Sequence, residues 1–311
     1  IHIGEGVCER LRELLAASRV SGRMALVTDS NVGPLYARGV AEQLAEDTVV
    51  CTLPAGEENK RLDQIEWLCG RFLEARLDRS SVVVALGGGV TGDMAGFAAS
   101  IFMRGIPFVQ IPTTIVAQVD SSVGGKTGVN HALGKNTLGA FHQPSAVFID
   151  MQFLTTLPDR ELRAGMAEVI KHGVIADAGL FQYLEQNAVR ILAKDLSAIE
   201  YPVVRSCEIK SDVVSQDERE QGVRANLNYG HTFGHGFEGV THYTHFLHGE
   251  AVALGMHAAA LLAVRLGMIT EDIAERQRLC IEAFGLPTRW SELPVQETIE
   301  YMRRDKKVRA G

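Results

Sequence analysis

The stretch from residue 81 to residue 89 limits the possible fold more than any other part of the chain. It reads Ser-Val-Val-Val-Ala-Leu and is followed at once by three glycines, Gly87, Gly88 and Gly89. A strand that is apolar at successive positions, rather than at alternate ones, must be covered on both faces, as in parallel sheets with helices on either side. The stretch therefore indicates an α/β architecture around a buried strand.

The first half of the chain alternates between strand and helix signals, which predicts a parallel sheet of the Rossmann-like kind. Strands are expected at 24–28, 48–53, 81–86 and 107–111, and helices at 35–44, 61–77 and 93–102. After residue 150 the pattern becomes helical, with periodicities at 161–175, 179–185, 188–209 (interrupted at Pro202), 227–240, 249–266 and 271–284. We place the boundary at Leu157 and Pro158, so that an α/β domain (1–157) precedes an all-α domain (158–311).

Composition excludes several classes of protein. With 46% hydrophobic and 22% charged residues the chain is globular, and a net charge of −7 without a basic run argues against nucleic-acid binding. The longest uncharged apolar run, 251–264, is too short to span a bilayer and predicts a buried helix. Five scattered cysteines without a CxxC spacing indicate reduced thiols, and no secretory signal is visible, so we expect a cytoplasmic protein.

Glycines mark the first candidate site, because eleven of the 31 fall between residues 87 and 139. Gly87–Gly92 follows the buried strand and fits the pattern GxGxxG, whose backbone N–H groups can bind a pyrophosphate at a helix N-terminus. The acidic residue that normally follows about 20 positions later is missing. This motif alone therefore leaves both a nucleotide site and an ordinary packing turn open.

Histidines mark the second candidate site, because five of the ten lie between residues 231 and 248. His231 and His235 are four positions apart, hence on one helix face, and the same face extends back to Asn228 and Arg224 if the helix begins early enough. Such a polar stripe favours metal ligation with acid–base chemistry. His248 can add a ligand from a second element.

Two further groups suit this chemistry. Glu168 would complete a His₂Glu set, the ligand count of a catalytic zinc site, although a solvated ion pair with Lys171 explains it equally well. Lys126 and Lys135 lie in glycine turns of an acidic chain, which suggests a phosphate or carboxylate site.

Taken together, these motifs resemble the 3-dehydroquinate synthases over essentially the whole chain. The resemblance is carried by residues 86–106, 112–137, 139–145, 167–174, 217–236, 247–257 and 305–308, and the segment 119–136 is the most specific of them. It implies an NAD-binding α/β domain, a helical metal-binding domain, and a cytoplasmic homodimer of the shikimate pathway. The expected reaction converts 3-deoxy-D-arabino-heptulosonate 7-phosphate into 3-dehydroquinate and phosphate.

The resemblance also implies roles for individual residues. Zinc or cobalt would bind Glu168, His231 and His248. Catalytic roles fall to His235, Lys126, Asn136, Lys171, Arg224 and Asn228. Further substrate contacts fall to Asp120, Lys135, Lys210, either Lys306 or Lys307, and Arg104, which would reach the phosphate in the neighbouring subunit. NAD contacts are expected from Asp29, Asn31, Gly56, Glu57, Glu58, Asn59, Lys60, Gly89, Val90, Thr91, Gly92, Asp93, Thr113, Thr114, Asp120, Lys126, Lys135, Phe153, Leu154, Thr155 and Thr156.

Three other functions remain open at this point. A related sugar-phosphate cyclase that makes a valiolone or a deoxy-inosose would share the glycine turn and the metal set. A metal-dependent polyol dehydrogenase would share the two-domain layout, but it has no need for Lys126, Lys135, Lys171 and Arg224. A non-catalytic NAD-binding subunit would be expected to have lost the metal set or the lysines, and the sequence retains both.

Overall fold

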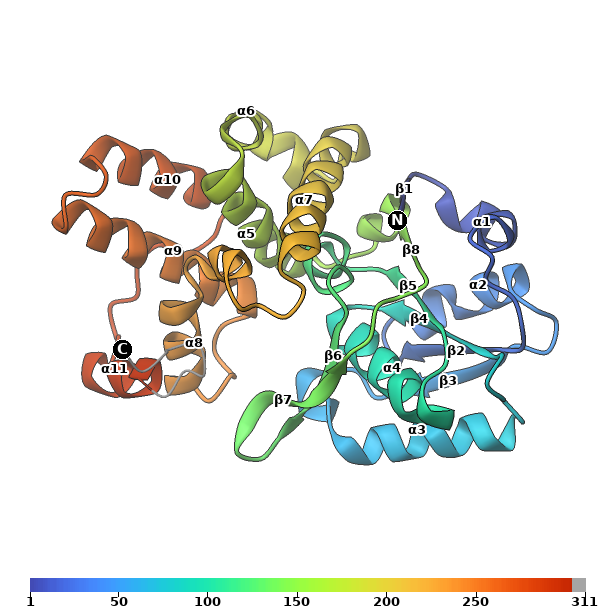
Figure 1. Cartoon of the computed structure of the whole chain (residues 1–311). Helices are drawn as coiled ribbons and strands as arrows, with labels where there is room; N and C mark the ends of the chain where they lie inside the picture. Colours follow the sequence, from blue (N-terminus) through green and yellow to red (C-terminus); the bar gives the residue numbers. More distant parts are fainter. Residues whose placement is uncertain (304–311) are drawn as a thin grey trace. The chain divides into compact units, whose positions relative to one another are not determined.

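The computed structural model describes residues 1–303 and divides the chain into two compact units, Ile1–Leu157 and Pro158–Gly311. Each unit is described by itself. Figure 1 labels the elements of both.

Unit 1 is built on a six-stranded sheet in the order β1-β8-β5-β4-β2-β3, in which all paired neighbours are parallel. Its strands are β1 (His2–Gly4), β2 (Met24–Asp29), β3 (Val49–Leu53), β4 (Val82–Gly87), β5 (Phe108–Pro112) and β8 (Ala146–Asp150). A separate antiparallel hairpin joins β6 (Lys126–His131) to β7 (Gly134–Phe141). The predicted parallel α/β sheet is therefore confirmed, and the hairpin was not foreseen.

The helices of unit 1 cover the two faces of this sheet (Figure 1). They are α1 (Leu11–Ala17), α2 (Arg38–Gln43), α3 (Leu62–Glu74) and α4 (Gly89–Ile101). Short helical segments connect them: η1 (Val7–Arg10), η2 (Gly33–Ala37), η3 (Glu57–Asn59), η4 (Phe102–Arg104), η5 (Ala117–Ser121) and η6 (Met151–Thr155).

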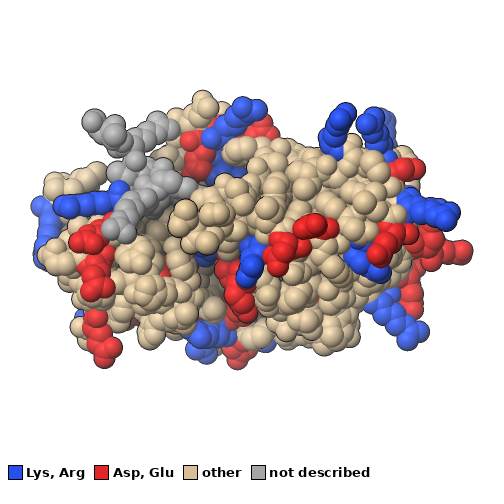
Figure 2. Space-filling model, turned by 90° about the horizontal axis from the view of Figure 1, so that it is seen from below, with Lys and Arg blue, Asp and Glu red and all other residues tan. Residues whose placement is uncertain are grey.

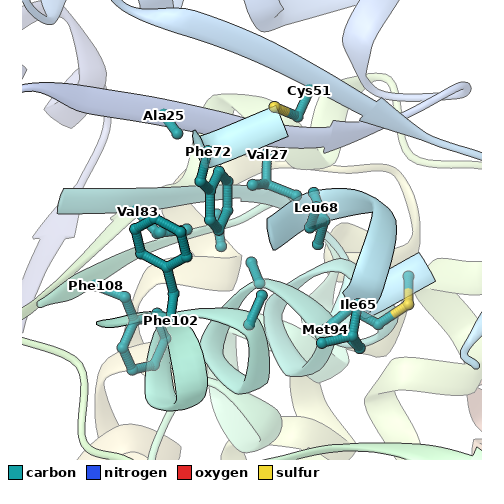
Figure 3. Packing of buried hydrophobic residues seen from close by; sticks show 14 of the residues in the cluster. Ala25, Val27, Cys51, Ile65, Leu68, Phe72, Val83, Met94, Phe102 and Phe108 are labelled. Carbon is teal, nitrogen blue, oxygen red and sulfur yellow. The ribbon is translucent and has the colours of Figure 1, made fainter. Parts of the chain in front are cut away.

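Strand β4 supplies side chains to a separate hydrophobic core on each face. Val83 and Ala85 pack with α3 and α4, whereas Val82, Val84 and Leu86 pack with α1 and α2. Figure 3 shows the first of these cores, where Phe72 of α3 and Phe102 meet edge to face with ring centroids 5.3 Å apart. Residues on both faces of β4 are buried, which is why its sequence is apolar without alternation.

Unit 2 is helical, as the periodicities predict. Its helices are α5 (Asp159–Ala176), α6 (Ala178–Leu192), α7 (Leu196–Gln216), α8 (His231–Val240), α9 (His248–Arg265), α10 (Glu271–Ala283) and α11 (Val295–Arg303), with the 3-10 segment η7 (Val223–Asn228) before α8. None of the described helices is both long and apolar enough to cross a membrane.

Three local expectations for unit 2 are wrong. Helix α7 runs through Pro202, and the break lies before α7, where Lys194 has a left-handed φ of 59° and the Asp195 side chain accepts a hydrogen bond from Ser197 N. The run 251–264 is buried only in its first part, because Leu261 and Leu262 are 49% and 45% exposed. The helix containing His231 does not extend back over Asn228, as described below.

The face that Figure 2 shows has no large basic patch, in agreement with the net charge of −7. Basic and acidic side chains alternate there rather than gather by sign. None of the described cysteines forms a disulfide.

Candidate active site

In unit 1, several predicted NAD-contacting residues lie where neighbouring parallel strands end. Asp29 ends β2, the glycine turn follows β4, and Thr113 and Thr114 follow β5. The chain order reverses between β2 and β4, since β3 lies outside β2 while β5 and β8 continue from β4. Ligands of open α/β sheets bind at the carboxyl ends of the strands, beside such a reversal.

Hydrogen bonds of Asp29 connect the two strands at this reversal. Its Oδ2 accepts from Thr91 Oγ1 at 2.9 Å, and its Oδ1 accepts from the backbone N–H groups of Asn31 and Val32 at 2.9 and 3.0 Å. Thr91 belongs to the first turn of α4, so the carboxylate fixes that turn against β2. The side chains of Asp29 and Thr91 and the backbone of Asn31 are thereby brought together.

The glycine turn forms the N-terminus of α4, which begins at Gly89, earlier than the sequence suggested. A Cβ on Gly87 would lie 2.6 Å from Thr91 Oγ1, and a Cβ on Gly92 would lie 2.7 Å from Gln110 Oε1. A Cβ on Gly87 would also lie 2.7 Å from Thr91 Cβ, so that position needs glycine for packing, whereas at Gly92 the amide end of Gln110 would have to move. The first N–H groups of any helix have no partner within it, so those of Gly89, Val90 and Thr91 are suited to bind a phosphate. The same turn thus packs tightly and offers N–H groups that suit an anion.

Lys60 links three of the predicted segments. Its Nζ donates to Asp93 Oδ2 and to Asn136 Oδ1, each at 2.6 Å, and its side chain is only 4% exposed. Asn136 lies in β7 with a left-handed φ of 52°. The sequence predicted Lys60, Asp93 and Asn136 separately, and the structure holds them in one network.

The remaining residues of the segment 56–60 surround this network. Glu57 Oε1 accepts from Asn130 Nδ2 at 2.9 Å and lies 4.0 Å from Lys135 Nζ. Asn59 Nδ2 donates to the carbonyl of Ala55 at 2.7 Å. A Cβ on Gly56, whose φ is 111°, would lie 2.5 Å from the carboxylate of Glu58.

The other predicted residues of unit 1 differ in exposure. Lys126 is exposed at the start of β6, and Asp120 is half-buried in η5. In the segment 153–156, Phe153 and Leu154 are buried, Thr155 and Thr156 are exposed, and Phe153 packs edge to face on Tyr36. Two of these four side chains therefore belong to the core. Arg104 is exposed, with a left-handed φ of 69° at the end of η4.

In unit 2, the predicted metal ligands converge from three helices. Glu168 lies in α5, His231 begins α8, and His248 begins α9. The Nε2 atoms of His231 and His248 lie 3.6 and 3.9 Å from Glu168 Oε1, and one ligand atom from each residue lies within 4.8 Å of the others. The His₂Glu set is thus assembled from residues up to 80 positions apart in sequence.

The two oxygens of Glu168 have different surroundings. Oε2 accepts a hydrogen bond from Lys171 Nζ, and both side chains are almost fully buried. Oε1 is buried and accepts no hydrogen bond from the described residues. The solvated ion pair that the spacing allowed is therefore wrong, because Glu168 and Lys171 lie in the interior of the unit.

This donor set fits a divalent zinc or cobalt ion. A buried carboxylate oxygen without a hydrogen bond is costly unless a cation binds it, and imidazole Nε2 atoms share the same space. Tetrahedral zinc with bonds of about 2.0–2.2 Å places neighbouring ligand atoms roughly 3.4 Å apart. The distances of 3.6 and 3.9 Å need to shorten by only a few tenths of an ångström. Three protein ligands leave coordination positions open, as in catalytic sites.

Helix α9 is fastened to α5 beside this set. Arg160 donates to both carboxylate oxygens of Glu250, at 2.7 and 2.8 Å, and to the carbonyl of His245 at 3.2 Å. Glu250 Oε2 also accepts from the N–H of Leu247. Partial burial alone would raise the pKa of Glu250, but the hydrogen bond from Arg160 and the other favourable contacts lower it. Glu250, which Arg160 contacts, thereby positions the residue before His248.

The predicted stripe of Arg224, Asn228, His231 and His235 is not one helix face. Arg224 and Asn228 lie in η7, and Gly230 then turns the chain with a φ of 79° before α8 begins at His231. A Cβ on Gly230 would lie 2.8 Å from Met256 N, so the turn depends on glycine for space as well as for conformation.

Acidic residues and carbonyls hold the polar side chains around η7. Asn228 Nδ2 donates to Glu220 Oε1 at 2.6 Å, and the buried Arg224 donates through Nη1 to the carbonyl of Glu218. Lys210 is buried on α7. The rings of His235 and His231 are 5.5 Å apart, and His235 is half-buried.

One prediction lies outside the described residues, and one candidate residue was not predicted. Lys306 and Lys307 lie outside the described residues. Glu238, which the sequence analysis missed, is buried on α8 with its carboxylate 3.2 Å from His248 Nδ1. Its spacing, three residues after His235 and seven after His231, was an available signal.

Comparison with known proteins agrees with the geometry. Residues 50–164 match the model of the 3-dehydroquinate synthase N-terminal domain, and residues 165–308 match that of the C-terminal domain. The 3-dehydroquinate synthase of Nitrosomonas europaea is 50% identical over the whole chain, which covers 85% of that protein. The one from Citrifermentans bemidjiense is 49% identical over 99% of the chain and 86% of its own length.

Solved structures of related cyclases are also similar. A 2-epi-5-epi-valiolone synthase from Streptomyces hygroscopicus, with NAD⁺ and Zn²⁺ bound, has a TM-score of 0.86 at 31% identity over 93% of this chain and 81% of that chain. A 2-deoxy-scyllo-inosose synthase complexed with carbaglucose-6-phosphate, NAD⁺ and Co²⁺ has a TM-score of 0.88 at 29% identity, over 99% and 84%. Both family models and the curated relatives lead to one conclusion: the chain belongs to the 3-dehydroquinate synthase family.

Proposed function

We propose that the chain catalyses the 3-dehydroquinate synthase reaction, in which 3-deoxy-D-arabino-heptulosonate 7-phosphate becomes 3-dehydroquinate and phosphate. The reaction proceeds by transient oxidation, phosphate elimination, re-reduction and aldol closure. The observation that carries the proposal is the buried Glu168 Oε1, which accepts no hydrogen bond from the described residues and faces two imidazole Nε2 atoms. Half of all positions are identical to curated members of the family.

Two groups supply chemistry that side chains lack. When bound, NAD would accept and return a hydride, and Zn²⁺ or Co²⁺ would acidify the hydroxyls that it coordinates. Glu168, His231 and His248 would hold the metal. The strand ends of unit 1, with the segments 29–31, 56–60, 89–93, 113–114 and 153–156, together with Asp120, Lys126 and Lys135, would hold NAD. That the related valiolone and inosose synthases were solved with NAD⁺ and Zn²⁺ or Co²⁺ supports this assignment.

The remaining polar residues would bind and orient the sugar phosphate. Lys126, Asn136 and Arg104 suit the phosphate, since they are cations or amide donors. Lys171, Lys210, Arg224, Asn228 and His235 suit the substrate carboxylate and hydroxyls, with further contacts from Asp120, Lys135 and Lys306. Because Glu168 Oε2 accepts from Lys171 Nζ, the same lysine also orients a metal ligand.

One assay tests the reaction. The protein with NAD, Co²⁺ and the heptulosonate phosphate should release one phosphate per substrate consumed, without accumulation of NADH. Steady formation of NADH from a simple polyol, without phosphate release, would contradict the proposal and support a dehydrogenase. The probable glycerol dehydrogenase of Sinorhizobium meliloti is 18% identical to this chain with a TM-score of 0.70, a likeness that shows a similar fold and supports no statement about activity.

The same assay, repeated with other sugar phosphates, tests the alternative of a related cyclase. The valiolone synthase and the deoxy-inosose synthase are 31% and 29% identical to this chain, against 50% for a 3-dehydroquinate synthase. Turnover of another sugar phosphate in preference to the heptulosonate would redirect the assignment. We expect the heptulosonate phosphate to be preferred.

We further propose a cytoplasmic homodimer in which Arg104 contacts the phosphate bound by the neighbouring subunit. The exposure of Arg104 and its left-handed backbone at the end of η4 support a role outside its own helix. A mixture of Arg104→Ala and His231→Ala chains, each nearly inactive, should regain activity after subunit exchange. Failure to regain it, despite demonstrated exchange, would show that Arg104 serves its own chain.

A further inference from the structure

We propose that Glu238 is a positioning residue that fixes the tautomer and the ring orientation of His248, so that Nε2 is available to the metal. This inference rests on the proposed metal site of Glu168, His231 and His248. Neither the resemblance nor the similar proteins assign a role to Glu238. The contacts of both His248 ring nitrogens and the burial of the Glu238 carboxylate support this role.

The Nδ1 atom of His248 lies 3.2 Å from Glu238 Oε2. An ionised carboxylate can only accept a hydrogen bond, so Nδ1 must carry the proton and donate. A neutral imidazole that is protonated at Nδ1 has its lone pair at Nε2. That nitrogen is the one that faces Glu168 Oε1, at 3.9 Å.

His248 needs such a partner more than the other histidine ligand does. Its side chain is 35% exposed, whereas that of His231 is 10% exposed. His231 has its own partner, since its Nδ1 lies 3.2 Å from the backbone carbonyl of Tyr229, and its Nε2 also faces Glu168 Oε1. Both histidines thus have an acceptor beside Nδ1, which is a backbone carbonyl for His231 and a side-chain carboxylate for His248.

Glu238 is well placed to hold the ring still. Its side chain is 4% exposed, and it shares one face of α8 with His231 and His235. Ligating histidines generally donate their second N–H to such an acceptor, which fixes the ring and raises the basicity of the ligating nitrogen. A buried anion beside the site also offsets the charge of a divalent cation.

A different geometry is available and must be tested against this one. His235, Glu238 and His248 also offer ligand atoms within 4.8 Å of one another, so Glu238 could itself bind the metal. We favour the positioning role because Glu238 already lies at hydrogen-bonding distance from Nδ1, while Glu168 Oε1 accepts no hydrogen bond from the described residues.

The test measures Co²⁺ affinity and the visible Co²⁺ spectrum of the full chain, without turnover. Glu238→Ala should weaken Co²⁺ binding by about 10–100-fold, the usual effect of losing such a partner. Glu238→Gln keeps an acceptor for Nδ1–H, so its affinity should fall by less than about tenfold with the spectrum unchanged. Wild-type affinity in Glu238→Ala, or equal losses in both variants, would overturn the proposal.

Two more variants separate positioning from ligation. His235→Ala should keep Co²⁺ affinity, and Glu168→Gln should lose it. The reverse pattern would place the metal on His235, Glu238 and His248, and the proposal would fail. Asp177→Asn serves as a stability control, because it removes a carboxylate that caps α6 and pairs with Arg205 without touching any of these residues.

Nitrogen-15 NMR of the metal-free chain gives a readout that general destabilisation does not imitate. In the wild type, the neutral His248 ring should carry its proton on Nδ1, and in Glu238→Ala the population should shift toward Nε2–H. A wild-type ring protonated at Nε2 would overturn the proposal. These results do not depend on phosphate release, so a chain that binds Co²⁺ as described but fails the turnover assay would refute only the proposed reaction.

Discussion

Gly249 of α9 lies directly against the carbonyl of Ala164 in α5. A Cβ built on Gly249 would be 1.7 Å from Ala164 O, which no rearrangement of a side chain can relieve. Because Gly249 follows His248 and Ala164 precedes Glu168 by one helical turn, this contact sets the distance between two of the proposed metal ligands. The same kind of contact joins α9 to the residue before α8, where a Cβ on Gly255 would be 2.0 Å from Gly230 O.

Gly249→Ala should therefore separate α5 from α9. We expect a loss of at least about 1–3 kcal/mol in the free energy of unfolding, as overpacking usually causes. We also expect Co²⁺ affinity to fall, because Glu168 and His248 would move apart. Chemical denaturation and Co²⁺ titration measure the two effects.

Gly70→Ala is the matched control. Gly70 lies inside α3 with nothing within 4 Å of a built Cβ, so alanine should stabilise the chain by up to about 1 kcal/mol through helix propensity. Equal stability changes for the two variants would show that the α5–α9 contact is not as tight as described.

Lys60→Met should destabilise unit 1 and weaken NAD binding. The substitution leaves Asp93 and Asn136 without the buried ammonium that both now contact, and removing one member of a buried ion pair typically costs about 3–5 kcal/mol. Since Asp93 is 21% exposed, we expect the lower end of that range. Denaturation curves and an NAD titration provide the measurements.

Arg38→Met tests the same change in an exposed setting. Arg38 and Glu42 form an ion pair with side chains 94% and 62% exposed, so its loss should change stability by less than about 1 kcal/mol. If Lys60→Met were as mild as Arg38→Met, the network of Lys60, Asp93 and Asn136 would contribute little.

Chelation should abolish turnover while the fold persists. A chain of this length has enough hydrophobic core to stay folded without a metal. Far-ultraviolet circular dichroism should remain unchanged in the presence of a chelator, and Zn²⁺ or Co²⁺ should restore phosphate release. His231→Ala and His248→Ala should resemble the chelated protein even with excess metal. Full metal content and activity in either variant would exclude the His₂Glu site.

The Asp177 carboxylate should make the stability of unit 2 depend on pH in acid. The hydrogen bond from Arg205 is the main cause that lowers the pKa of Asp177, and the hydrogen bond from Leu180 N–H lowers it further. A carboxyl group with a lowered pKa contributes stability above its unfolded pKa of about 3.9, and that stability is lost as pH falls through the folded value. The contribution to stability is therefore complete at neutral pH. It begins to fall near pH ~4 and is lost as the pH passes through the lowered pKa of the folded state.

Asp177→Asn should remove part of this acid dependence. Asparagine caps a helix about as well as aspartate, so the substitution removes mainly the charge and its ion pair with Arg205, which should cost about 0.3–1 kcal/mol at neutral pH. The difference from the wild type should narrow as the pH is lowered. Denaturation at several pH values measures it. A difference that stays constant down to pH ~3 would mean that ionisation of Asp177 does not stabilise the fold.

The sequence alone predicted the parallel sheet and its helical partner domain, because both depend on local periodicity. The run 82–86 is apolar at successive positions since both faces of β4 are covered, and that pattern is visible without coordinates. The proposed metal ligands rest on a different argument, because Glu168, His231 and His248 occur in motifs that resemble one family. Neither argument required knowledge of how the helices pack.

Only the tertiary structure decided the surroundings of those residues. The spacing of Glu168 and Lys171 suits both a solvated pair and a buried one, and burial depends on helices distant in sequence that cover α5. The helical spacing suggested that Asn228 and His231 lie on one helix. Gly230, with its left-handed backbone between them, instead separates η7 from α8. Glu238 gains its role from a histidine on another helix, and Lys60 gains its partners from α4 and β7. Such contacts form between residues far apart in the chain, so local sequence determines which side chains are present and long-range packing determines which of them meet.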